Sequence, residues 1–140
     1  MNRFTPLPPV TAADHREVLE LLELYFDAFH RSDAEQVGRL FHPSALYGFV
    51  EGDQLRRLDM PTYLPIVASR PSPAAAGRAR DDRVLALDFA GPTTALARVE
   101  CNIFGKHFVD LLSLLRIEGR WQIVAKVFHV VSEESVPCRT

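Results

Sequence analysis

The chain has 140 residues, which is enough for one domain to bury a core without metals or disulfides. Its apolar content of 47% and charged content of 24% are typical of a globular protein. The net charge of −2, with no run of basic residues, lacks the electrostatic footprint of a nucleic-acid-binding protein, so no nucleic-acid partner is expected.

Cysteine usage and hydropathy bear on the cellular compartment. Cys101 falls in a predicted strand and Cys138 in a polar tail, so we expect free thiols in a reducing compartment, with a disulfide between them as the alternative. The first ten residues have no apolar segment of the kind found in signal peptides, and no apolar stretch reaches membrane length. We therefore expect a cytoplasmic protein without a membrane partner.

The N-terminal part of the chain is predicted to be helical. After an extended arm at residues 1–10, Thr11 is a suitable N-cap for a helix from Ala12 to Arg31. One line along this helix is apolar and consists of Val18, Leu22, Tyr25 and Phe29. Ser32-Asp33-Ala34-Glu35 has the form of a capping box, which predicts a second helix that ends at about Phe41.

A pair of strands and a third helix are predicted next. The strands are expected at Ala45–Val50 and Gln54–Leu58, with a turn between them. The helix is expected at about Pro61–Ser69, where Pro65 lacks a backbone donor and should keep the helix short or distorted. The segment Arg70–Gly77 is predicted to be a mobile surface loop.

The last third of the chain alternates apolar strands with tight turns. Strands are predicted at Arg83–Phe89 and in three segments between Thr93 and Val131, with breaks at Gly105-Lys106 and Glu118-Gly119. A polar tail occupies residues 132–140. This order of elements predicts one α+β domain, in which a curved antiparallel sheet wraps around the first helix and leaves a cone that is open at one end.

Two stretches of the sequence resemble a known superfamily. LELYFDAFHRSDAEQVGRLFHPSA resembles the start of NTF2-like proteins, which are also called SnoaL-like and have the cystatin-like fold. FVDLLSLLRIEGRWQIVAKVFH and the ASRPSP loop resemble the branch labelled "putative lumazine-binding". The resemblance implies a pocket beneath the long helix and a homodimer formed through the outer face of the sheet. It implies no single activity, because the superfamily includes isomerases, cyclases, dehydratases, epoxide hydrolases and non-catalytic binding proteins.

The pairing of the last two strands decides which side chains face the pocket. If Glu118-Gly119 is the turn and no bulge is present, Leu114 pairs with Ile123 and Asp110 with Val127. One face of the sheet then carries Asp110, Leu112, Leu114, Trp121, Ile123, Ala125, Val127 and His129. A bulge of one residue would exchange part of this set for residues of the opposite face, which include Lys126 and Phe128.

Asp110 is the main candidate for chemistry because it is a carboxylate within an apolar strand. Desolvation favours the neutral form of a carboxyl group, which suits a general acid or base near neutral pH. His129 is a diagonal neighbour in the assumed register and would orient Asp110 or share its proton. The alternative is a structural aspartate that is satisfied by a backbone group, or by Lys126 if the register differs.

Tyr25 lies at the centre of the apolar line of the first helix. Isomerases of the superfamily use a tyrosine on this helix as an oxyanion donor, and the resemblance implies that role for Tyr25. The alternative is a core aromatic whose hydroxyl reaches a backbone carbonyl. The predicted ligand-binding residues are aromatic side chains and one leucine, namely Phe29, Phe41, Tyr47, Phe49, Tyr63, Leu112 and Trp121.

These residues support two hypotheses for function, with no metal or cofactor expected because the sequence has no paired histidines, phosphate loop or nucleophile elbow. The first is a cofactor-independent isomerase or dehydratase that uses Asp110, Tyr25 and His129 on a small hydrophobic or heteroaromatic molecule. The second is a non-catalytic module for ligand binding or dimeric interaction. A cone that is filled by aromatic side chains would remove the small-molecule hypotheses.

Overall fold

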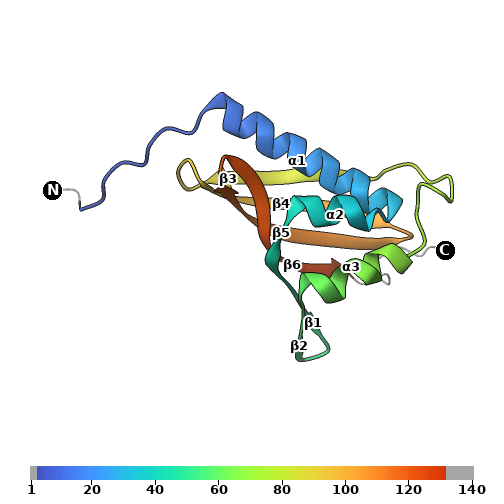
Figure 1. Cartoon of the computed structure of the whole chain (residues 1–140). Helices are drawn as coiled ribbons and strands as arrows, with labels where there is room; N and C mark the ends of the chain where they lie inside the picture. Colours follow the sequence, from blue (N-terminus) through green and yellow to red (C-terminus); the bar gives the residue numbers. More distant parts are fainter. Residues whose placement is uncertain (1–2, 132–140) are drawn as a thin grey trace.

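The computed structural model describes residues 3–131 and shows three helices and six strands (Figure 1). Cys138 and the predicted tail lie outside the described residues. The elements, in chain order, are α1 (Ala12–Arg31), α2 (Ala34–Leu40), β1 (Phe41–Glu51), β2 (Gln54–Leu58), α3 (Met60–Ser69), β3 (Asp82–Phe89), β4 (Thr94–Ile103), β5 (Lys106–Ile117) and β6 (Arg120–Val131).

The strands form a single mixed sheet in the order β2-β1-β6-β5-β4-β3. β1 pairs with β6 in parallel, and the other neighbours are antiparallel. In Figure 1 the three helices lie against the sheet, while the β1–β2 hairpin extends away from the other strands. The predicted α+β class is therefore confirmed. The sheet was predicted to be antiparallel throughout, whereas the β1–β6 pair is parallel.

The ends of α1 and α2 follow from their capping residues. Thr11 and Asp14 form a capping box at the start of α1, because each side chain accepts from the backbone of the other. The predicted capping box at Ser32 is wrong. Ser32 has a φ of 52° and closes α1, whereas Asp33 is the N-cap of α2 and accepts from the backbone N–H of Gln36.

The start of β1 also differs from the prediction, since the strand begins at Phe41 and not at Ala45. Pro43 is accommodated because the pairing of β1 with β6 shifts between Phe41 and Leu46, where a ladder hydrogen bond is not needed. The third helix runs through Pro65 and spans only ten residues, as the proline predicted.

Two tight turns set the pairing of the last three strands. Phe104-Gly105 joins β4 to β5 and Glu118-Gly119 joins β5 to β6, and all four residues have positive φ angles. Two successive positive φ angles are the mark of a type I′ turn, which matches the twist of a hairpin. The second turn confirms the predicted break, and the first lies one residue before the predicted one.

The register between β5 and β6 contains a bulge that the prediction had left out. Leu114 pairs with Ile123 as predicted, but Ser113 pairs with Ala125, so Val124 has no partner on β5. From that point on, every side chain of β6 changes face. Asp110 pairs with Phe128 and Leu112 with Lys126, while His129 pairs with Val109 on the opposite face.

The segment that follows α3 is a surface loop, as predicted. Its residues form turns that are tied to the C-terminal end of α1, because Ala74 N–H and the Ser72 hydroxyl both donate to the backbone carbonyl of His30, at 2.9 and 3.1 Å. The hydroxyl of Ser32 donates in turn to the carbonyl of Pro71. These bonds hold the loop beside the open end of the fold, and its mobility stays a prediction.

The core fills one end of the space between α1 and the sheet. Val18 and Leu22 of α1 are fully buried, as are Val99, Leu112 and Leu114 of the sheet. The C-terminal half of α1 faces a cavity. None of the helices within residues 3–131 is both long enough and apolar enough to cross a membrane.

Candidate active site

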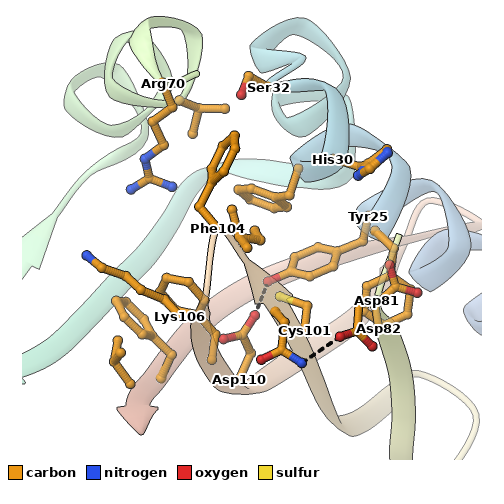
Figure 2. A pocket seen from close by; sticks show the side chains of 18 of the residues that line it. Tyr25, His30, Ser32, Arg70, Asp81, Asp82, Cys101, Phe104, Lys106 and Asp110 are labelled. Carbon is orange, nitrogen blue, oxygen red and sulfur yellow. Dashed lines mark hydrogen bonds between the residues drawn. The ribbon is translucent and has the colours of Figure 1, made fainter. Parts of the chain in front are cut away.

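A cavity of about 450 Å³ opens beside the C-terminal half of α1 (Figure 2). Its walls come from α1, β1, the β4–β5 hairpin, β6 and the segment that follows α3. Aromatic rings make up much of the wall, namely those of Tyr25, Phe26, Phe29, Tyr47, Phe49, Phe104, Phe108 and Phe128. The volume is in the range of small-molecule sites, so the cone is not filled by its own side chains.

Tyr25 and Asp110 meet at the floor of this cavity. The Tyr25 hydroxyl donates to Oδ2 of Asp110 at 2.5 Å, and both residues are almost completely buried. Figure 2 shows this bond between the helix and the strand. Oδ1 of Asp110 has no hydrogen-bond partner within the described residues. Oδ1 is itself buried, so this unpaired oxygen would gain a partner only from a group that reaches it from the cavity.

Lys126 is the third polar group of the floor. Its Nζ lies 3.6 Å from Oδ2 of Asp110, and its side chain is 8% exposed. The bulge at Val124 brings the two charges together, because it turns Lys126 to the face of Asp110. The sequence had offered Lys126 only as a partner of Asp110 in a different register. The one feature of the sequence that could have indicated Lys126 is that it is a single lysine in an apolar strand, where a buried cation needs a partner.

The Lys126 ammonium also lies within an aromatic box. Its Nζ is 4.4 Å from the ring centroid of Phe29 and between 5.2 and 5.9 Å from four other centroids, those of Tyr25, Tyr47, Phe128 and Tyr63. The faces of aromatic rings attract cations, most strongly where water is excluded. The floor can therefore hold a positive charge away from solvent.

The three tyrosines of the chain surround this floor, and the pKa of each is raised. Burial raises the pKa of Tyr25 well above its usual value of 10, and the negative charge of Asp110 acts in the same direction. Burial raises the pKa of Tyr47 to about 12, although Lys126 opposes the change. Burial likewise raises the pKa of Tyr63, against the opposing charge of Arg70. All three hydroxyls therefore remain protonated and can act as donors.

Charged groups of both signs also line the cavity. Asp82 is held by Arg80, with two N–O distances of 3.0 Å, and Asp81 accepts from the side-chain amide of Asn102. The guanidinium of Arg70 lies 5.9 Å from the centroid of the Tyr63 ring and has no carboxylate partner within residues 3–131. Burial raises the pKa of the Cys101 thiol in the wall to about 12, which makes it a weak nucleophile.

The structure brings together some of the predicted site residues and separates others. Tyr25, Asp110, Phe29, Tyr47 and Phe49 line the cavity. Phe41, Tyr63 and Leu112 are buried in the core, and Trp121 packs edge-on against Phe89 outside the cavity. His129 lies on the opposite face of the sheet, so the predicted contact between His129 and Asp110 is wrong, because the bulge reverses the direction of its side chain. No group of three metal-ligating side chains occurs among residues 3–131.

The fold and its cavity define an NTF2-like protein with the cystatin-like arrangement of helices on a curved sheet. Residues 13–129 match the family described as "Putative lumazine-binding", and the chain belongs to that family.

Two solved structures are similar to the whole fold. An NTF2-like protein from Methylobacillus flagellatus KT has a TM-score of 0.78 and 28% identity, over 91% of this chain and 100% of that one. An NTF2-like protein from Shewanella baltica OS155 has a TM-score of 0.79 and 22% identity, over 89% and 99%. Among curated proteins, aldolase FrzH from Cladobotryum sp is 27% identical over 123 residues, which cover 86% of this chain and 94% of the relative.

The raised tyrosine pKa values predict an unusual ultraviolet titration. The native protein should show little tyrosinate absorbance at pH 10 to 11, whereas the chain unfolded in guanidinium should titrate near pH 10. Only the unfolded state loses these protons near pH 10. The contribution of the protonated tyrosines to the free energy of unfolding is therefore complete below pH 10 and is lost as the pH rises towards 12. A native titration midpoint near pH 10 for any tyrosine would contradict the described burial.

Proposed function

We propose that this protein is an enzyme that transfers a proton at the carbon next to a carbonyl group, using only its own side chains. Isomerisation, dehydration and aldol reactions all share this step. The observation that carries the proposal is the pair at the floor of the cavity, in which Tyr25 donates to Oδ2 of Asp110 and leaves Oδ1 free. The chemistry needs a positioned base, a donor and exclusion of water, and the buried pair of Asp110 and Tyr25 supports that proposal.

Asp110 is the proposed general base. It is 2% exposed and lines a cavity whose wall is largely aromatic, so little bulk water would compete with a substrate for its carboxyl group. The hydrogen bond from Tyr25 and the charge of Lys126, 3.6 Å away, fix the other oxygen. These two contacts hold the carboxyl group in one orientation and leave the buried Oδ1 as the oxygen that would take the proton.

Tyr25 is the proposed donor to the oxygen of the substrate. In the structure its proton is engaged with Asp110. When Asp110 takes a proton from the substrate, the carboxyl group loses its negative charge and accepts this bond less strongly. The Tyr25 hydroxyl can then turn to the enolate oxygen, where a negative charge has developed. The raised pKa of Tyr25 keeps the hydroxyl protonated for that purpose.

The relative named aldolase FrzH supports the same class of reaction, because an aldolase makes or breaks a carbon–carbon bond next to a carbonyl group. Asp110 and Tyr25 belong to the region that matches the family, residues 13–129. The aromatic wall favours a substrate with an apolar or planar body and a ketone or aldehyde group at the floor.

Replacing Asp110 by asparagine should slow the reaction sharply while the protein stays folded. With benzylacetone in heavy water, proton NMR should show exchange of the protons next to the carbonyl group, and Asp110→Asn should reduce the rate by about 10²- to 10⁴-fold, the usual contribution of a general base. Asp88→Asn is the control, because Asp88 is exposed on β3 and lies outside the cavity. Equal rates for Asp110→Asn and the original protein would contradict the role of Asp110.

Non-catalytic binding of a planar heteroaromatic molecule is the second candidate. The observation in its favour is the row of rings along the wall, in which Tyr47, Phe49 and Phe128 lie with centroids 4.9 to 6.0 Å apart. The description of the family refers to lumazine, a pteridine. The planes of these rings are tilted against one another by 33 to 75°, so a flat ligand would stack on one ring and meet the others edge-on.

Lumazine binding can be measured through the fluorescence of the ligand. Phe128→Leu removes one ring from the wall and should weaken binding by about tenfold, which corresponds to the free energy of one aromatic contact. Phe89→Leu is the matched control, since Phe89 packs on Trp121 outside the cavity. Two results together would favour this second candidate over the enzyme. Lumazine binding should be saturable and unaffected by Asp110→Asn, and no carbonyl compound should undergo proton exchange.

We also propose that the chain forms a homodimer through the outer face of its sheet. This face exposes large apolar side chains from three adjacent strands, namely Leu96, Leu111, Leu115 and Val127. Apolar side chains that are exposed together on one face of a sheet favour an interface there.

Light scattering tests the dimer. Leu111→Glu places a charge at the centre of this face and should convert dimers to monomers. Leu55→Glu on β2 is the control, because Leu55 is exposed at the other edge of the sheet and should leave the mass unchanged. A monomer mass for the original protein at micromolar concentration would overturn the proposal.

A further inference from the structure

Lys126 has features that a purely structural cation does not need. It lies on β6 between Tyr47 of β1 and Leu112 of β5, in the middle of the sheet. Its side chain is buried and still lines the cavity. No hydrogen bond to its Nζ occurs among residues 3–131, and its one charged neighbour, Asp110, lies at 3.6 Å, beyond hydrogen-bond distance. The amine is therefore held near the cavity without being tied by a hydrogen bond.

The choice of lysine at this position is informative because the chain otherwise uses arginine. Of the 16 basic residues, only Lys106 and Lys126 are lysines, and both line this cavity. A guanidinium could supply the positive charge and would pair with Asp110 in a bidentate way. A lysine offers what arginine cannot, an amine that becomes a nucleophile when it loses a proton.

We propose that Lys126 is a nucleophile of this site and forms a Schiff base with a ketone or aldehyde. The later steps rest on the proposed role of Asp110 as the base. Lys126 first gives a proton to the Asp110 carboxylate, and its lone pair then attacks the carbonyl carbon. The new C–N bond forms as the electrons of the C=O double bond move to oxygen, which takes the proton that nitrogen loses.

Loss of water completes the Schiff base. Asp110 returns its proton to the hydroxyl group, the C–O bond breaks, and one water molecule leaves. The net change exchanges one ammonium and one carbonyl group for one protonated imine and one water, so the positive charge stays on nitrogen. The five rings around Nζ stabilise a cation before and after this exchange.

The regenerated Asp110 carboxylate then lies beside an activated carbon. It can take a proton from the carbon next to the imine, and the electron pair of that C–H bond forms an enamine. In a β-hydroxy ketone it can instead take the hydroxyl proton, so that the carbon–carbon bond breaks, an aldehyde leaves and the electrons form the same enamine. The substrate class is thus a carbonyl compound with an apolar body, and the site would act by covalent rather than purely electrostatic activation.

Reductive trapping tests the covalent step on the full-length protein. With benzylacetone and cyanoborohydride, hydride from the reductant converts the imine to a stable secondary amine. The mass of the protein should then rise by that of the ketone less one oxygen atom. Peptide mapping should place the label on Lys126, with Lys106 and the terminal amine as internal comparators in the same sample. Labelling spread over all three amines, or confined to the other two, would overturn the proposal without any variant.

Two matched variants extend this test. Lys126→Arg keeps the charge but should lose the label, whereas Lys106→Arg should keep it at Lys126. Circular dichroism and thermal unfolding report whether each variant folds. If Lys126→Arg does not fold, the peptide mapping of the original protein alone decides whether Lys126 forms the Schiff base.

Proton exchange in heavy water separates the two proposals. If Asp110-dependent exchange proceeds while Lys126 remains unlabelled, the Schiff base is wrong and the proposed function stands. If Lys126 is labelled without exchange, the amine site stands and the role of Asp110 as base fails.

Discussion

The hydrogen bond between Tyr25 and Asp110 joins the middle of α1 to the centre of the sheet. Both partners are buried, so leaving either one without the other would cost the desolvation of a polar group. The bond fixes how the C-terminal half of α1 lies over β5, and the cavity opens beside it. This polar contact therefore links the helix, the sheet and the candidate site within a largely apolar interior.

The bulge at Val124 is the second constraint, because it decides which charges share the interior with Asp110. Without it, β6 would present Ala125 and Val127 to the helix, and Lys126 would lie on the outer face. With it, Lys126 pairs with a carboxylate and with aromatic rings, and His129 faces outward. Bulges are often found beside active sites, where they redirect a side chain, and this one redirects the only buried cation among the described residues.

The low polarity of the cavity strengthens each electrostatic contact within it. The same exclusion of water raises the pKa of all three tyrosines and makes an unpaired carboxylate oxygen costly. Stability alone is a weak reason for this arrangement, since replacing a buried ion pair by apolar side chains of similar volume is often neutral or stabilising. Acid–base catalysis and ligand recognition both make use of such a site, and the two candidate functions differ in whether the proton moves.

The sequence by itself determined the elements, the α+β class and the likeness to NTF2-like proteins. It also indicated Asp110 and Tyr25, on the first helix, as candidate residues of one site. These follow from local rules, such as the period of apolar residues, the cap at Thr11 and the turn at Glu118-Gly119. Only the tertiary structure decided the face of each β6 side chain, because one bulged residue reverses a strand and leaves no local signal in a run of Ile, Val and Ala. For the same reason the sequence placed His129 beside Asp110, whereas packing placed Lys126 there, where a buried carboxylate gains from an opposite charge.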